Sequence, residues 1–167
     1  MTGGDNKSAR QWALRALGRR MHTAYEIRAA LSRRGYTDDV AGSVVDEMAR
    51  QGYIDDLQFA RVWVKSRSAH QFHGRLRLLR DLRQKGIPDE MAESVIKDSL
   101  PDEDEVAIAK KAAERKLRTM RSMGRAADRS RGKKGRDALY RHLRSRGFTT
   151  RVISLAMADL TFEEDPS

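Results

Sequence analysis

Two histidines have the residue type and the spacing of a metal site. His70 and His73 stand three residues apart, and a helix would place both imidazoles on one side. The chain has no cysteine, and no carboxylate stands close to the two histidines in the sequence. The residues around His73 have the composition of a turn, which would separate the two rings. We therefore expect no metal ion and no other cofactor.

Two pairs of aspartates raise the alternative of a nuclease, because paired carboxylates can hold a catalytic divalent cation. Asp38-Asp39 and Asp55-Asp56 each stand at the start of an apolar helical pattern. A carboxylate at that position accepts hydrogen bonds from free backbone N–H groups and complements the helix dipole. The chain contains neither a Walker-type phosphate-binding motif nor Gly-x-Ser-x-Gly. The residues therefore argue against an enzyme.

Basic residues provide the remaining chemistry. The chain of 167 residues has 34 Lys and Arg against 24 Asp and Glu, a formal net charge of +10. Such a balance favours an acidic partner, above all nucleic acid, although a solvated basic surface is the alternative interpretation. The residues for which we expect contact with nucleic acid are Arg77, Arg80, Arg83, Arg118, Arg121, Arg125, Arg129, Arg131, Lys133, Lys134, Arg136, Arg141 and Arg144.

Three further cations have a simpler explanation. Arg34, Lys85 and Arg146 each stand directly before a glycine at the end of a helical pattern. A cation at that position complements the helix dipole wherever the helix lies in the protein. We therefore expect these three side chains to have structural roles.

The chain contains an internal repeat of three helices. The pattern Phe59-Ala60-x-x-Trp63-Val64 lies over Trp12-Ala13-x-x-Ala16-Leu17 and over Ile108-Ala109-x-x-Ala112-Ala113. The second helix of each repeat ends in Leu-x-x-x-Gly-apolar, with glycines at Gly35, Gly86 and Gly147, spaced by 51 and then 61 residues. Such units are too small to be stable alone and stack on their neighbours. The repeat predicts an all-α fold, with about nine helices in three tandem three-helix repeats that form an elongated, curved array.

The repeat also predicts the domain organisation. We expect a disordered tail at 1–7, three-helix repeats at 8–54, 55–101 and 102–162, and a second tail at 163–167. The third repeat contains a basic insertion at 123–135, whose glycines predict a mobile loop. Within the first repeat, Thr23 and Glu26 have the spacing of a capping box. No apolar run reaches the length of about 18 residues that a membrane span needs, and we expect a cytoplasmic monomer.

The stretch Gly52-Tyr53-x-Asp55-Asp56-x-x-Phe59-Ala60-x-x-x-Val64 is similar to the signature of the RecX family of recombination regulators. The resemblance covers nearly the whole chain from Ala9 to Leu160. Its departures are Thr23 where serine is commoner, no proline beside Gly74, and the basic insertion. The signature positions that we assign to structure are Asp55, Asp56, Phe59, Ala60, Val64, Gly35, Gly86 and Gly147.

The resemblance implies a non-enzymatic protein that binds the RecA–DNA filament, lies in its groove and lowers RecA ATPase, strand exchange and co-protease activity. It would thereby modulate recombination, DNA repair and the SOS response. The implied partners are the RecA filament and single- and double-stranded DNA, bound independently of sequence.

The alternative is a helix-turn-helix transcription regulator, in which a basic last helix enters the major groove. Against it, the third helices predicted at 40–51 and 88–100 carry more acid than base.

Overall fold

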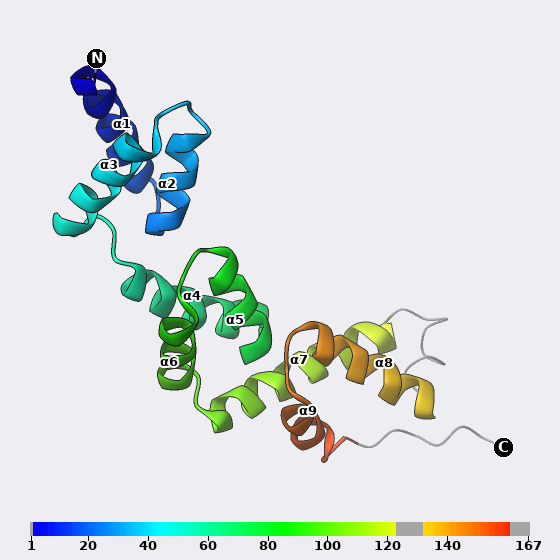
Figure 1. Cartoon of the computed structure of the whole chain (residues 1–167). Coiled ribbons are helices and arrows are strands. Elements are labelled where there is room, and N and C mark those ends of the chain that lie inside the picture. The colour runs from blue at the N-terminus through cyan, green and yellow to red at the C-terminus, as the bar shows by residue number, and fades with distance from the viewer. Residues whose placement is uncertain (1, 123–131, 161–167) are drawn as a thin grey trace. The chain divides into compact units, whose positions relative to one another are not determined.

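A computed structural model describes residues 2–122 and 132–160, which form the nine helices of Figure 1. Repeat 1 consists of α1 (Thr2–Leu17), α2 (Ala24–Ser32) and α3 (Asp38–Arg50). Repeat 2 consists of α4 (Asp56–Gln71), α5 (Arg75–Gln84) and α6 (Asp89–Ser99). Repeat 3 consists of α7 (Asp102–Ser122), α8 (Gly132–Ser145) and α9 (Thr150–Met157). The predicted all-α fold of tandem three-helix repeats is confirmed, and the curvature of the array stays a prediction.

The first helix begins earlier than the sequence pattern indicated. We expected a disordered tail at 1–7 and the first repeat from residue 8, whereas α1 runs from Thr2 to Leu17. Asp5 in the first turn favours this start, because its charge complements the helix dipole. The helix ends at Leu17, directly before Gly18, a residue type with a high entropic cost in a helix.

The end of the basic insertion also differs from the expectation of a loop. Lys133 and Lys134 lie in the first turn of α8, and Gly135 is buried. Gly135, Leu139 and Leu143 follow each other at four-residue intervals and extend one buried face of the helix, which explains the earlier start. The rest of the insertion, at 123–131, and the expected tail at 163–167 lie outside the described residues.

The predicted helix ends are confirmed at Thr23 and at the repeated glycines. The Thr23 hydroxyl accepts a hydrogen bond from Glu26 N, and the Glu26 carboxylate accepts one from Thr23 N, which is the expected capping box. Gly35, Gly86 and Gly147 have φ angles of +88°, +77° and +86°, in the left-handed region that favours glycine.

The same positions are buried in each repeat. Ala13, Ala60 and Ala109 are all fully buried, and their small side chains allow the first helix of each repeat to pack closely. The second helices bury a matching series of larger residues, namely Ile27 and Leu31, Leu78 and Leu82, and Leu139 and Leu143.

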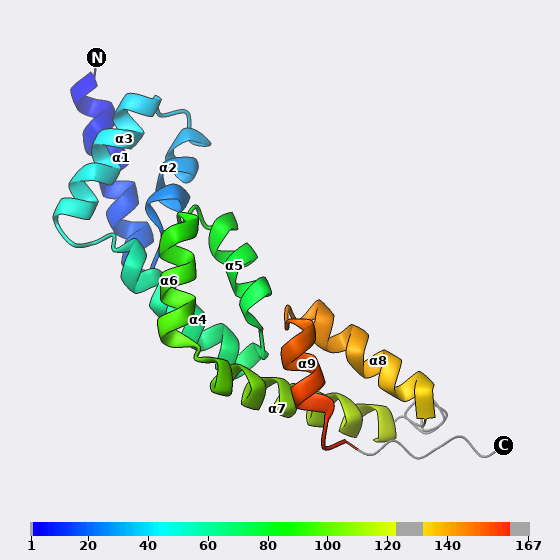
Figure 2. The ribbon, with the colours of Figure 1, turned by 60° about the horizontal axis from the view of Figure 1, so that its bottom comes forward.

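The chain packs into two compact units that do not coincide with the three repeats. One consists of Met1–Trp63 with Asp81–Val95, and the other of Val64–Arg80 with Ile96–Ser167. Repeat 2 is therefore shared, and its helices can be followed in both views of the ribbon (Figures 1 and 2). Across 2–122 and 132–160, no helix combines the length and the apolarity that a membrane crossing requires.

Candidate nucleic-acid interface and the joints that support it

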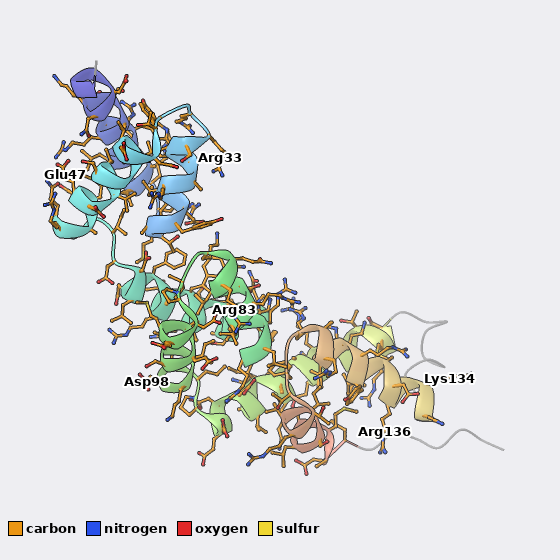
Figure 3. All side chains as sticks on the ribbon, viewed as in Figure 1. Arg33, Glu47, Arg83, Asp98, Lys134 and Arg136 are labelled. Atoms are coloured by element: carbon orange, nitrogen blue, oxygen red, sulfur yellow. The ribbon has the colours of Figure 1, made fainter. Side chains whose placement is uncertain are left out.

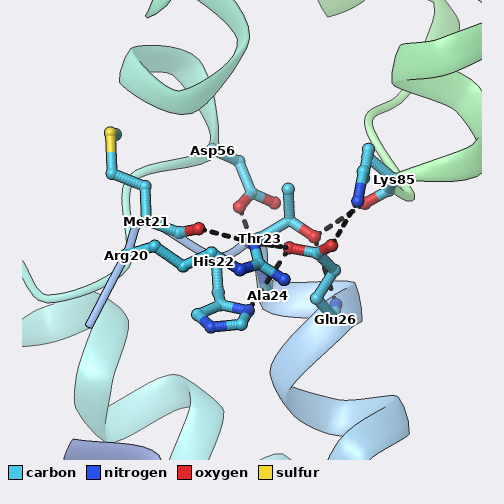
Figure 4. A network of polar contacts seen from close by, with 8 residues as sticks. All are labelled: Arg20, Met21, His22, Thr23, Ala24, Glu26, Asp56 and Lys85. Atoms are coloured by element: carbon cyan, nitrogen blue, oxygen red, sulfur yellow. Dashed lines mark hydrogen bonds and ion pairs between the residues drawn. The ribbon is translucent and has the colours of Figure 1, made fainter. Parts of the chain in front are cut away.

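A joint between repeats 1 and 2 forms around the first turn of α2 (Figure 4). The Thr23 hydroxyl, which accepts from Glu26 N over 3.1 Å, also donates to Lys85 O over 2.7 Å. The Glu26 carboxylate pairs with Lys85 Nζ at 2.5 Å. The start of α2 is therefore held against the end of α5 by both a neutral and a charged contact.

The two aspartates at the start of α4 cap two different helices. The Asp55 carboxylate accepts from Gln58 N over 2.8 Å and caps its own helix, as expected. The Asp56 carboxylate instead accepts from Ala24 N over 2.9 Å, so that it caps α2. Burial raises the pKa of Asp56, although the hydrogen bond from Ala24 opposes that shift.

Opposite charges determine the protonation of Glu26. Burial by itself would raise its pKa, but hydrogen bonds and charge interactions with Lys85 and Arg20 lower it below the ordinary value. For His22, burial and then the nearby Arg20 charge lower the pKa. Near pH 7 the joint therefore contains an ionised Glu26 beside a neutral His22.

The same joint contains a close contact between the backbone of Gly86 and the side chain of Tyr25. A Cβ atom added to Gly86 would lie 2.2 Å from Tyr25 Cβ. No side chain fits at that distance, so the glycine is required for space as well as for its positive φ.

A second joint, between repeats 2 and 3, has the same plan. Gly74 occupies the position of Thr23, and its N–H donates to Arg146 O over 2.9 Å. Leu76 N donates to Gly147 O over 3.0 Å. A Cβ on Gly147 would lie 2.3 Å from Arg77 N. The start of α5 thus lies against the end of α8, as the start of α2 lies against the end of α5.

The carboxylate of Asp56 has a counterpart at Glu105. Glu105 is fully buried, and its carboxylate accepts from Arg75 N over 2.8 Å and pairs with Arg75 Nε at 2.5 Å. Asp102 pairs with the same guanidinium from a largely exposed position. In both joints, then, an acid of the following repeat caps the second helix of the preceding one. The signal in the sequence is the run of four acids from Asp102 to Glu105, although a local pattern assigns these acids only to the start of α7.

The cations predicted on α5 have three different environments. Arg80 is exposed. Arg77 is half-buried, because its backbone forms the contact with Gly147. Arg83 forms a double hydrogen bond to Asp89, at 2.6 and 3.0 Å. Arg80 is therefore the most accessible of the three to a phosphate.

A larger basic cluster lies in the second compact unit. Figures 1 and 2 both place the C-terminal end of α7 beside the N-terminal half of α8. The side chains of Lys134 and Arg136 extend away from the helices in Figure 3. Among the predicted contact residues, those that lie exposed on these two helices are Arg118, Arg121, Lys133, Lys134, Arg136, Arg141 and Arg144. The remaining candidates, Arg125, Arg129 and Arg131, lie outside the described residues.

The cations before the repeated glycines contact other parts of the protein. Lys85 pairs with Glu26, and Arg146 Nη1 donates to Gln71 O. The Arg34 guanidinium stacks on the Trp12 ring, 4.1 Å from its centroid. These contacts support the structural roles that we expected.

No cluster of three or more His, Asp or Glu side chains within residues 2–122 and 132–160 could hold a metal ion. His70 lies exposed in the last turn of α4, whereas His73 is buried beyond the end of that helix. The turn thus separates the two histidines, as their sequence context indicated.

Comparisons with known proteins agree with the repeat and its signature. Profiles described as RecX, first three-helix domain, and RecX, second three-helix domain, match residues 9–48 and 55–96. The chain is 34% identical over 157 residues to Regulatory protein RecX of Pelodictyon phaeoclathratiforme, covering 94% of this chain and 91% of that protein. It is 32% identical over 160 residues to Regulatory protein RecX of Prosthecochloris aestuarii, covering 96% and 98%.

Solved structures share the fold. The crystal structure of RecX from Lactobacillus salivarius matches with a TM-score of 0.79 at 18% identity, covering 94% of this chain and 97% of that one. A second crystal structure, that of a regulatory protein RecX, matches with a TM-score of 0.78 at 20% identity, covering 93% of this chain and 74% of that one.

Proposed function

The chain belongs to the RecX family of regulatory proteins, and from this premise we propose that it inhibits RecA by binding along the RecA–DNA filament. The activities that it lowers are RecA ATPase, strand exchange and co-protease activity. The proposal includes binding to single- and double-stranded DNA without sequence preference. The observation that carries it is the similarity to RecX proteins over nearly the full chain.

The distribution of charge supports this mode of action. Exposed cations occur on α5, α7 and α8 rather than on one recognition helix. A filament is a repeating lattice, so several weak contacts from one chain add through their effective concentration. Phosphates of the DNA and acids on the protein surface of the filament would both complement these cations.

The third helices do not favour a transcription regulator. Both α3 and α6 begin with acidic residues, Asp38 and Asp39 in one and Asp89 and Glu90 in the other. Such helix starts would repel the phosphates that flank a major groove.

RecA ATPase on single-stranded DNA tests the proposal. The protein is added to filaments that have already formed, and we expect ATP hydrolysis to fall with increasing protein. A variant with Lys133, Lys134 and Arg136 changed to Ala should inhibit less. Its matched control changes Arg15, Arg28 and Arg50, three exposed cations of repeat 1, and should inhibit as the wild type does. Unchanged ATPase at saturating wild-type protein would refute the proposed inhibition.

A further inference from the structure

We propose that a groove within repeat 1 binds the phosphodiester backbone of single-stranded nucleic acid. The groove has a volume of about 610 Å³ and is lined by residues between Trp12 and Arg34, from α1, α2 and the turns that follow them. Its lining includes none of the cations of α5, α7 and α8 described above. The inference adds a contact to the DNA binding contained in the proposed function, and so it rests on that function.

The groove has an excess of positive charge. Four guanidinium groups line it, those of Arg19, Arg20, Arg33 and Arg34. Among the lining residues the only carboxylate is Glu26, which already pairs with Lys85 and Arg20. His22 has a lowered pKa, caused first by burial, and adds no charge near pH 7. Apart from Arg20, the arginines of the groove are therefore not neutralised by a carboxylate of its lining.

Two of the four arginines are available to a ligand. Arg34 stacks on Trp12 and donates to Ala30 O, so that it forms part of the wall. Arg19 and Arg33 are exposed, and neither guanidinium has a carboxylate partner in the described part of the chain. Figure 3 shows Arg33 at the C-terminal end of α2.

This end of α2 differs from its counterparts in the other repeats. A Cβ added to Gly86 or Gly147 would collide with a preceding repeat, whereas a Cβ added to Gly35 would meet nothing within 4 Å. Next to Gly86 and Gly147, at the ends of α5 and α8, the preceding repeat fills the space. Next to Gly35, at the end of α2, the described chain leaves that space open.

The combination of side chains fits nucleic acid. Arginine can bind a phosphate through two parallel hydrogen bonds. Tyr25 lines the groove and is 56% exposed, so that its ring offers a surface on which a base can stack. An acidic peptide would satisfy the arginines but would leave this ring without a flat partner.

Fluorescence of Trp12 provides a local test without RecA. The chain has two tryptophans, and Trp63→Phe leaves Trp12 as the only one. Oligothymidylate is titrated into this protein, and binding is also followed by anisotropy of labelled DNA. Arg19→Ala/Arg33→Ala is compared with Arg28→Ala/Arg50→Ala, which removes the same charge from exposed positions outside the groove. Thermal unfolding confirms that each variant is folded.

We expect DNA to change the Trp12 fluorescence. The groove variant should bind about tenfold more weakly or worse, since two charge-assisted hydrogen bonds are lost. It should also reduce the slope of log K against log salt by about 1.4, or about 0.7 for each phosphate contact. The control pair should change the slope by less than half as much.

Equal slopes for the two double variants would overturn the inference, and so would DNA binding without any change in Trp12 fluorescence. A fluorescence response to polyglutamate but not to oligothymidylate would identify an acidic peptide as the ligand instead. RecA is absent from these measurements, so their outcome is independent of whether the protein inhibits RecA ATPase.

Discussion

A position can require glycine because its φ is positive or because no Cβ fits beside it, and Gly35 and Gly86 differ in the second respect. Both have positive φ, but only Gly86 contacts another repeat. The sequence pattern Leu-x-x-x-Gly predicted the backbone conformation at both positions, because it reports how a helix ends. It could not distinguish them, since the contact with Tyr25 depends on the packing of residues far apart in the sequence.

Alanine substitutions can measure the two effects separately. Gly35→Ala should cost about 1 kcal/mol, the penalty for an L-residue in the left-handed region. Gly86→Ala should cost about 1–3 kcal/mol more, because its Cβ collides with Tyr25 as well. Urea unfolding of both variants checks this difference. Equal losses of unfolding free energy in the two variants would mean that Tyr25 moves away from the added Cβ at no energetic cost.

The ion pairs of Glu26 predict a dependence of stability on pH. Its pKa in the folded protein is below the ordinary value of 4.5, despite the opposing effect of burial, because Lys85 and Arg20 stabilise the carboxylate. The stabilisation is therefore complete above the pKa of the unfolded chain and is lost as the pH falls through the lower pKa of the folded protein.

Glu26→Gln should remove this contribution. We expect the wild type to exceed the variant in unfolding free energy at pH 7, and the difference to shrink on acidification below about pH 4.5. Subtracting the two proteins cancels the titration of groups remote from Glu26, whereas the pKa values of Asp56 and His22 change with the substitution because the Glu26 charge acts on both. A difference that stays constant from neutral to acid pH would contradict the role of the charge.

At the scale of elements, the second helix of a repeat is capped by an acid of the next repeat. Asp56 caps α2, and Glu105 caps α5. Acids stand at the starts of both α4 and α7, where the dipole of each helix would by itself explain them. That explanation holds for Asp55 but not for Glu105, whose partner Arg75 lies 30 positions earlier in the chain. Local patterns do not contain such a pairing.

Glu105 and Asp102 form a matched pair for testing this cap, since both contact Arg75. Glu105→Ala should cost about 3–5 kcal/mol, because it removes one half of a buried ion pair and leaves Arg75 N unpaired. Asp102→Ala should cost at most about 1 kcal/mol, because its side chain is 65% exposed. Thermal and urea unfolding measure both values, and similar losses for the two variants would argue against Glu105 as the main contact.

At the scale of the whole molecule, the repeat predicted the order and number of helices in the described chain. It did not predict the beginning of α8 at Gly132, because three glycines and several cations suggested a loop through residue 135. The buried face of α8 determines that start, and burial is a tertiary property. Equally, the sequence placed no candidate contact in the groove of repeat 1, whose arginines lie on two segments that only the fold brings together.

The basic cluster of α7 and α8 should make DNA binding dependent on salt. Lys133→Ala/Lys134→Ala should reduce the slope of log K against log salt by up to about 1.4 on single-stranded DNA, if both contact phosphates. Anisotropy of labelled oligothymidylate at several salt concentrations gives this slope. An unchanged slope would assign these two lysines to the solvated surface of the helix.

The central claim is that the protein acts on the RecA filament and does not merely sequester DNA. The measurement that tests it most directly is RecA ATPase on preformed filaments, titrated with the protein at a fixed amount of DNA. The titration is then repeated with extra single-stranded DNA and enough RecA to coat it. We predict inhibition at well below one molecule per RecA protomer, undiminished by the added coated DNA. Inhibition that appears only when the protein saturates the DNA would contradict action on the filament and leave general DNA binding as the explanation.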